Sequence, residues 1–362
     1  MQYSIRKLKA MATATLEVLK EDMLKYKNTL VFVGAEINSL NTKDPIYVQG
    51  RPSSRRFSHR ASSSCHANPT RAHLALTQLL RAGYIKYLMT ENTDGILIKA
   101  GADEDSVIEI NGNVHTEECL GCGLSFVREF CVQTSHCGIR TCQLCGAKLQ
   151  DTVITRTDSP DLVLKESISQ AMEEAEHLLI IGSIPTSDRS AKYLHPHINS
   201  GCVKVTCVSQ QKPKETNVQW LEFGPAEFSV HLCKLLNVEV TNYKIQRTVS
   251  LIISKKEDQW LIRTNCLTSG GRHFSCLKGV DVIPCIGEEE LEEDPEVLCY
   301  DPYQCVLPSS ETTNKCHLEI FYLFFGFNQE PEWSVGVPLS ESSHMFQLCC
   351  SPGDTEWSVT KL

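Results

Sequence analysis

The sequence contains no apolar run as long as the roughly 18 residues that a membrane-spanning helix requires, and its N-terminus lacks the apolar core of a secretory signal. We therefore expect no membrane span and an intracellular, reducing compartment. Positive charge is not in excess either, because the net charge is −9. This balance argues against dominant electrostatic capture of nucleic acid. In a reducing compartment the 18 cysteines are free thiols or metal ligands, not disulfides.

The sequence also lacks a repeat at any fixed period, which argues against a repeat array. Its composition is that of an ordinary globular protein, with 41% hydrophobic and 22% charged residues. A length of 362 residues predicts two domains, one of which can be large.

Strands alternate with helices from the N-terminus to about residue 245. Short apolar runs predict buried strands, and apolar residues at helical spacing predict helices. The predicted strands cover residues 29–34, 85–92, 106–110, 178–183 and 203–209, and the predicted helices cover 68–84, 166–177 and 228–238. This alternation is typical of an α/β fold with a parallel sheet, which we place in a domain spanning residues 1–245.

Small and polar residues directly follow three of these strands. Gly34 follows the first strand, Asn92 and Asp94 follow the second, and Gly182 with Ser183 follows a later one. Parallel sheets bind ligands at the carboxyl ends of their strands, so the pattern predicts a ligand site there. The alternative for Asn92 and Asp94 is a β-turn, which both residue types favour.

The remainder of the chain, residues 246–362, has a different pattern. Apolar segments separated by polar turns predict strands at 248–254, 259–264, 317–327 and 345–350. No helical period of useful length is visible there, so we predict a β-rich C-terminal extension. The acidic stretch at 287–296 is expected to be a solvated loop.

Two Cys-x-x-Cys pairs predict a metal module at about residues 112–155. The pairs are Cys119 with Cys122 and Cys142 with Cys145, and nineteen residues lie between them. This spacing is typical of a four-cysteine zinc site, in which two turns complete a tetrahedron of thiolates. Four cysteine ligands leave no open coordination position, so the Zn²⁺ is expected to be structural. The alternative is two pairs of thiols without metal.

The order of short motifs along the chain resembles that of the sirtuin family of NAD-dependent protein lysine deacylases. A strand leads into "GAEIN", and "TENTDG", "EINGN", the two cysteine pairs and "IIGS" follow in the family's order. The resemblance covers roughly residues 15–245, and "IRTCQLCGAKLQDTVI" is similar to the nuclear sirtuin seven subfamily. It implies a Rossmann-like domain with an inserted zinc module, and NAD⁺ as the acceptor of the acyl group with release of nicotinamide. It also implies a nuclear, chromatin-associated protein that acts on the acylated lysine of histones or other nuclear proteins.

The resemblance implies a role for single residues at the matched positions. The positions that it assigns to NAD⁺ binding are Gly34, Ala35, Glu36, Glu91, Asn92, Asp94, Gly182 and Ser183. Two of them depart from the family, which has Gly at the position of Glu36 and Gln at that of Glu91. A carboxylate beside a pyrophosphate is repulsive. Val208 also replaces a family Asn, so one contact to the adenosine ribose is expected to be lost.

Two further departures concern the loop after the first strand. Asp44 lies before Pro45, where the family has its Asp after the Pro, and the family Arg is absent. The polar, basic and Ser-rich stretch at 51–69 predicts a loop, with a basic interaction patch as the alternative. A segment missing between Tyr47 and Pro69 is the remaining possibility.

Asn111 occupies the position of the family's catalytic His. An imidazole takes up a proton near neutral pH, whereas a carboxamide only donates and accepts hydrogen bonds. His115 lies four residues further along and is a poor substitute base, and Glu91 is another conceivable one. The sequence therefore leaves two hypotheses: a sirtuin-type deacylase with impaired turnover, or a catalytically dead sirtuin-fold protein that binds partners.

Overall fold

The computed structural model describes residues 16–38, 68–128, 132, 140–142, 144–154, 158–185, 189–267, 274–286, 289–290, 296–298, 303–310, 316–324, 333–351 and 356–362. The chain divides into two compact units, Met1–Val114 with Thr152–Tyr243 and His115–Asp151 with Lys244–Leu362. The domain boundary at residue 245, and the assignment of the cysteine module to the N-terminal domain, remain predictions. The loop predicted at 51–69 lies outside the described residues, apart from its last two.

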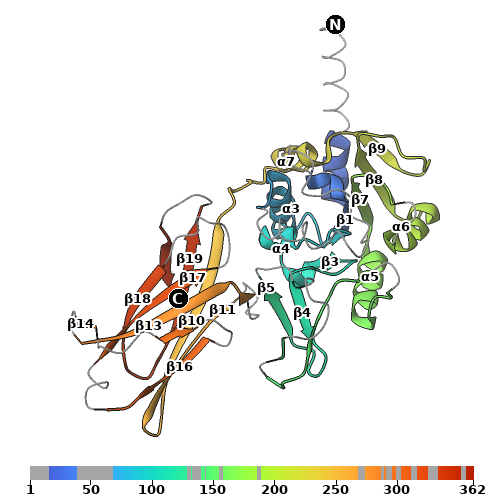
Figure 1. The fold of residues 1–362 in the computed structure, drawn as a ribbon. Coiled ribbons are helices and arrows are strands. Elements are labelled where there is room, and N and C mark those ends of the chain that lie inside the picture. The colour runs from blue at the N-terminus through green and yellow to red at the C-terminus, as the bar shows by residue number, and fades with distance from the viewer. Residues whose placement is uncertain are drawn as a thin grey trace. The chain divides into compact units, whose positions relative to one another are not determined.

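The first unit contains a six-stranded parallel sheet (Figure 1). In spatial order its strands are β3 (Val107–Glu109), β2 (Tyr87–Thr90), β1 (Thr29–Val33), β7 (His177–Ile181), β8 (Lys204–Ser209) and β9 (Gln219–Glu222). The order reverses between β1 and β7, as it does in Rossmann-like sheets. The five predicted strands all belong to this sheet, and β9 was not predicted.

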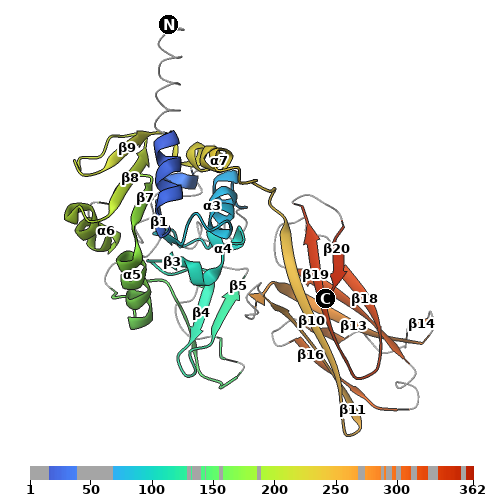
Figure 2. The same ribbon diagram turned by 180° about the vertical axis from the view of Figure 1, so that it is seen from behind.

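Helices cover both faces of the sheet, as Figures 1 and 2 show. They are α3 (Arg71–Arg81), α4 (Ile96–Lys99), α5 (Leu162–Glu174), α6 (Arg189–Ser200) and α7 (Pro225–Leu235). Val31 and Val33 of β1 pack with α3 and α7, whereas Leu30 and Phe32 pack with α5 and α6. Successive side chains of a strand point to opposite faces, so a strand covered on both faces is apolar throughout. In the described part of the chain, no helix is long and apolar enough to cross a membrane.

Two buried histidines make the stability of the first unit depend on pH. Burial lowers the pKa of His73 and of His177 from 6.5 to about 4. His73 accepts from the Thr70 backbone N–H at 3.2 Å, and His177 contacts the hydroxyls of Thr29 at 3.4 Å and Thr206 at 3.0 Å. The unfolded chain binds more protons than the folded one between these pKa values, so the free energy of unfolding increases with pH across that window.

We therefore expect stability to be complete above about pH 6.5 and to fall on acidification, by on the order of 2 kcal/mol per ring between pH 7 and pH 5. Scanning calorimetry across this range measures the effect as a decrease in the melting temperature of the first unit. His177→Asn should reduce the pH dependence, and His231→Asn at an exposed position should not. Equal pH dependence in wild type and His177→Asn would contradict this expectation.

The C-terminal part of the second unit is a pair of packed sheets. One sheet contains, in spatial order, β16 (Tyr303–Pro308), β11 (Gln259–Leu267), β10 (Ile245–Lys256), β19 (Ser342–Cys350) and β20 (Ser358–Lys361). The other sheet contains β14 (Glu289–Glu290), β13 (Leu277–Ile286), β17 (His317–Phe324) and β18 (Trp333–Pro338). β15 (Glu296–Leu298) is also paired to β13. The predicted β-rich extension is confirmed. The stretch at 287–296 was predicted to be a loop, but it contains β14.

Two tyrosine hydroxyls connect the paired sheets. Tyr303 donates to the backbone oxygen of Leu277 at 2.5 Å, and Tyr322 hydrogen-bonds Thr264 at 3.1 Å. In the sheet that begins with β16, buried and exposed residues alternate along a strand, as β16 itself shows. One face of that sheet therefore forms the core and the other face meets solvent. The α/β sheet, the cysteine module and this extension together confirm the predicted fold class.

Candidate functional site

The carboxyl ends of four strands lie level at one edge of the parallel sheet. Val33 pairs with Thr90 on one side and with Ile181 on the other, and Thr90 pairs with Glu109. The residues that follow these strands are therefore neighbours although they are far apart in sequence. The edge includes the point where the strand order reverses, which is the usual ligand position in such sheets.

Gly34, Gly182 and Ser183 form a cradle at this point, and the side chain of Glu36 lies in it. Glu36 belongs to η1 (Ala35–Asn38). The backbone N–H of Ser183 donates to Glu36 Oε2 at 2.8 Å, and its hydroxyl donates to Glu36 Oε1 at 2.6 Å. Gly182 has a φ of 114°, and a Cβ there would lie 2.0 Å from Glu36 Oε2. Only glycine allows the backbone to approach the carboxylate this closely.

The cradle has the chemistry of an anion site, because an N–H and an O–H converge on one pair of anionic oxygens. The anion in it is the chain's own carboxylate. As these side chains lie, the residues do not fit a pyrophosphate, since the donors it would use are engaged and Glu36 has the same charge sign.

Thr90, Asn92 and Asp94 organise the adjacent strand end. The Thr90 hydroxyl donates to the backbone oxygen of Val33 at 3.0 Å and accepts from the Asn92 N–H at 3.0 Å. The buried Asp94 accepts from the Ile96 N–H at 3.0 Å, a bond from its side chain to the backbone two residues further along, just where the short helix α4 begins. Such a local bond from side chain to backbone is expected if Asn92 and Asp94 serve to form a turn, which is the alternative given above. The roles of Asn92 and Asp94 in NAD⁺ binding remain predictions.

The side-chain amide of Asn111 is held at both ends. Its nitrogen donates to the backbone oxygen of Glu91 at 3.0 Å, and its oxygen accepts from the Arg189 guanidinium at 2.7 Å. A carbonyl only accepts and a guanidinium only donates, so these two partners determine the amide orientation. Arg189 also donates to the backbone oxygens of Ile110 at 3.3 Å and Asp158 at 2.9 Å.

The residues after Asn111 explain the Gly-Asn pair of the motif. Gly112 has a φ of 72°, and a Cβ there would lie 1.8 Å from the backbone oxygen of Thr152, so no other residue fits. The Asn113 amide nitrogen donates to both carboxylate oxygens of Glu109, at 3.1 and 2.9 Å. Burial raises the pKa of Glu109 to about 8, the hydrogen bond from Asn113 opposes this, and the charge of Asp94 adds to it.

The structure thus brings the predicted residues Gly34, Glu36, Glu91, Gly182 and Ser183 to the same sheet edge as Asn111. Arg189 was not predicted, because 78 residues separate it from Asn111 and no spacing in the sequence relates them. Ala35 lies in η1, but its side chain is outside the described part, as is the Pro-Asp stretch at 44–47. Val208, predicted as a lost ribose contact, is fully buried in β8.

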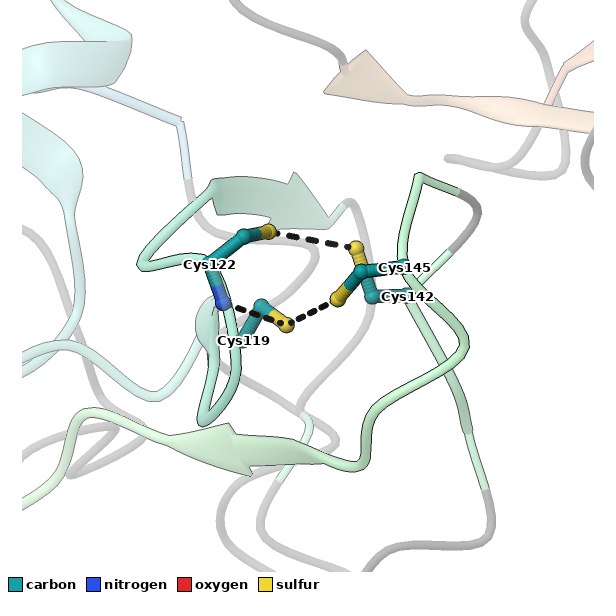
Figure 3. Close-up of side chains that lie close together, drawn as sticks. All are labelled: Cys119, Cys122, Cys142 and Cys145. Atoms are coloured by element: carbon teal, nitrogen blue, oxygen red, sulfur yellow. Dashed lines mark hydrogen bonds between the residues drawn. The ribbon is translucent and has the colours of Figure 1, made fainter.

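The four predicted cysteines meet in the second unit (Figure 3). All four sulfurs lie within 4.8 Å of one another. The Sγ atoms of Cys119 and Cys145 are 3.4 Å apart, and those of Cys122 and Cys142 are 3.6 Å apart. Zn–S bonds of about 2.3 Å in a tetrahedron imply sulfur separations of about 3.8 Å, so the cluster fits a four-coordinate Zn²⁺.

The two cysteine turns are built alike. The N–H of Gly123 donates to the Cys119 backbone oxygen at 2.9 Å, and that of Gly146 donates to the Cys142 backbone oxygen at 2.8 Å. The two glycines have φ of 70° and 72°, which the repeated Cys-x-x-Cys-Gly sequence supplies. The N–H groups of Cys122 and Gly121 point at the Cys119 sulfur and lower the pKa of that thiol.

The described part of the cysteine module contains few buried apolar residues. Its strands are β4 (Thr116–Cys119), β5 (Ser125–Arg128) and β6 (Leu149–Asp151), joined at the edge of β5 by β12 (Phe274–Ser275) from the C-terminal part. In the described part of the module, one cluster of buried residues contains Cys119, Phe126, Cys142 and Leu149, and two of these belong to the four-cysteine cluster. The module therefore depends on interactions other than apolar burial.

A buried ion-pair network is one of these interactions. Glu117 accepts from Arg128 Nε at 3.0 Å and from Arg140 Nε at 2.7 Å. Glu117→Ala removes the carboxylate beside a buried guanidinium, so we expect a loss of about 3–5 kcal/mol in the stability of the module. Hydrogen exchange of the β4 amides measures it. Glu118→Ala, on the exposed face of the same strand, is the matched control, and equal protection in the two variants would contradict the expectation.

Comparison with known proteins gives the class of this chain. The Sir2 family model matches residues 37–187. The chain is 26% identical to the NAD-dependent protein deacetylase SRT1 of Arabidopsis thaliana over 290 residues, which are 74% of this chain and 60% of that protein. It is 28% identical to the NAD-dependent protein deacetylase sirtuin-7 of Rattus norvegicus over 182 residues, 48% of this chain and 42% of that protein.

These matches show that the chain contains a Sir2, or sirtuin, domain, and they make it similar to two proteins named NAD-dependent protein deacetylases. The chain spans 60% and 42% of the lengths of these two relatives. A solved Sir2 homologue–NAD complex resembles it with a TM-score of 0.47 and 19% identity, over 61% of this chain and 94% of that one. A likeness with so low a TM-score does not define the fold, which rests on the strand order described above.

Proposed function

We propose that the chain is a sirtuin-type protein lysine deacylase whose acyl transfer is impaired because Asn111 replaces the family's base. NAD⁺ supplies the ADP-ribosyl group that receives the acyl group in this chemistry. The resemblance to the sirtuin seven subfamily makes the substrate an acylated lysine of histones or other nuclear proteins, and the location the nucleus. The four cysteines hold Zn²⁺ in a structural role.

The impairment is inferred from one observation, which is that both polar atoms of the Asn111 side chain are engaged in hydrogen bonds. Its nitrogen donates to Glu91 and its oxygen accepts from Arg189. A carboxamide has no titratable form near neutral pH, so it can orient a hydroxyl but cannot remove the proton. General-base catalysis commonly contributes a factor of about 10² to 10⁴ in rate, which is the deficit we expect.

The strand order supports the nucleotide part of the proposal. The residues offered for NAD⁺ binding are Gly34, Ala35, Glu91, Asn92, Asp94, Gly182 and Ser183, and the position of Glu36 lies among them although its carboxylate opposes a phosphate group. They follow the ends of β1, β2 and β7, on both sides of the point where the order reverses. That is where open parallel sheets bind nucleotides.

A catalytically inert sirtuin-fold binding protein is the second candidate. The Glu36 carboxylate in the cradle favours it, because this contact opposes the binding of a phosphate group at that position. In this version the chain binds acylated or other protein partners through the same fold and releases no nicotinamide.

Deacylation of an acetylated histone peptide by the zinc-loaded protein tests the proposal. With saturating NAD⁺ we expect slow formation of acylated ADP-ribose, about 10²-fold or more below a sirtuin that keeps its His. Asn111→Ala should change this rate less than about tenfold, because the amide it removes is not a base. A normal wild-type rate, or its collapse in Asn111→Ala, would contradict the proposal. No product although the peptide binds would favour the binding protein.

A further inference from the structure

The cradle at the point where the strand order reverses is occupied by a group of the chain itself, which is the carboxylate of Glu36. The two Ser183 donors engage the two carboxylate oxygens separately, at 2.8 and 2.6 Å. Gly34 also borders the carboxylate, since a Cβ there would lie 3.2 Å from Oε2. This arrangement of backbone N–H, hydroxyl and glycine backbone is how proteins bind phosphate oxygens.

We propose that Glu36 is the specificity-determining residue of this site, an internal anion that takes the position of a nucleotide phosphate and makes the site reject a pyrophosphate. The inference rests on the proposed nucleotide function. A phosphate oxygen and the carboxylate cannot both accept from Ser183, and the two groups repel each other. A pyrophosphate therefore binds only after the Glu36 side chain has moved out.

Because η1 is anchored in the core, only the side chain of Glu36 has to move. Ile37 is fully buried in the core on the α3 and α7 face of the sheet, and its N–H lies 3.5 Å from the backbone oxygen of Gly34. Glu36 is half-buried and Ser183 is exposed, so the carboxylate can rotate away without opening the core. Removing the carboxylate should then change ligand affinity and leave the fold intact.

The surroundings of the cradle add to its selectivity. The buried Cys207 thiol donates to the backbone oxygen of Gly182 at 3.5 Å. Burial raises the pKa of Cys207 to about 11, the Ser209 hydroxyl opposes this, and the negative charges of Glu215 and Glu36 add to it. The carboxylate of Glu36 itself adds one negative charge at the cradle, which disfavours a doubly charged pyrophosphate and leaves an uncharged nucleoside largely unaffected.

Calorimetric titration with ADP-ribose tests the proposal, because this probe carries the pyrophosphate and binding is measured without turnover. The zinc-loaded wild type is compared with Glu36→Gly and with Glu36→Gln, which keeps the shape and removes the charge. Glu222→Gln, at the end of β9 on the same sheet edge, controls for the change in net charge. Adenosine is the probe without phosphate.

We expect Glu36→Gly to bind ADP-ribose at least about tenfold more tightly than wild type, with Glu36→Gln between them and Glu222→Gln equal to wild type. Adenosine should bind wild type and Glu36→Gly alike. Equal, measurable ADP-ribose affinity in wild type and both Glu36 variants overturns the inference and leaves the proposed function standing. No ADP-ribose binding to folded Glu36→Gly, checked by its melting temperature, overturns both.

Discussion

Replacement of Cys142 by Ser is expected to abolish zinc binding and to unfold the cysteine module. The sulfurs of Cys142 and its three partners lie within 4.8 Å of one another, and a serine hydroxyl does not supply the thiolate that Zn²⁺ binds. Structural Zn²⁺ contributes about 10–16 kcal/mol in small domains, more than the few buried apolar residues in the described part of this module can supply. This is the largest stability effect that we expect from a single substitution in the chain.

Metal analysis and hydrogen exchange together measure this outcome. Wild type should carry one zinc per chain and protect the amides of β4 and β5, and Cys142→Ser should lose both. Cys202→Ser is the matched control, because Cys202 is an exposed cysteine outside the cluster. A Cys142→Ser protein that keeps its zinc and its protection would show that the four sulfurs do not form the metal site.

Conversion of Asn111 to His should give the largest gain in rate, by a factor of about 10² to 10⁴ in acyl transfer at saturating NAD⁺. The comparison is sharpest in a Glu36→Gly background, which separates the chemical step from nucleotide binding. The reason for the gain is that an imidazole supplies the proton acceptor that the amide lacks. Single-turnover formation of acylated ADP-ribose is the measurement.

Arg189 should limit the rate that Asn111→His gains, because its charge makes a nearby imidazole a weaker base. Its guanidinium lies 2.7 Å from the Asn111 oxygen and would lower the pKa of an imidazole placed there. Adding Arg189→Gln should therefore shift the pH dependence of the variant toward higher pH. Asn111→Gln is the matched control, because it lengthens the side chain and keeps the amide. A rate for Asn111→His no higher than that for Asn111→Gln, with ADP-ribose binding intact, would show that the missing base does not limit turnover.

The elements predicted correctly from sequence are those with a strong local signal. β1 and β7 are buried along their whole length, so a continuous apolar run predicts them without ambiguity. The cysteine pairs predict a metal cluster because coordination chemistry restricts the spacing of the ligands, and all four sulfurs do converge. The order of the family motifs along the chain then predicts which strand ends form the ligand-binding edge of the sheet.

Other features depend on contacts that no local pattern encodes. α6 contains Pro196 and polar residues, so helical spacing does not predict it. The Glu36–Ser183 contact joins residues 147 positions apart. The sequence indicates only that Glu36 is repulsive to phosphate, and the structure shows which donors it uses. In the C-terminal extension, β16 and β18 were missed because short strands with one exposed face carry a weak apolar signal. β13 was missed although it is ten residues long, because Lys, Gly, Asp and Pro interrupt its apolar pattern, and β20 was missed because it is exposed throughout.

Position 111 has no group that takes up a proton near neutral pH. The pH dependence of single-turnover acyl transfer, compared between Glu36→Gly and the double variant Glu36→Gly with Asn111→His, tests it most directly. We expect the double variant to gain rate through an ionisation at or below about pH 6.5, and the chain with Asn111 to lack that ionisation. The same ionisation in the chain that keeps Asn111 would show instead that another residue is the base.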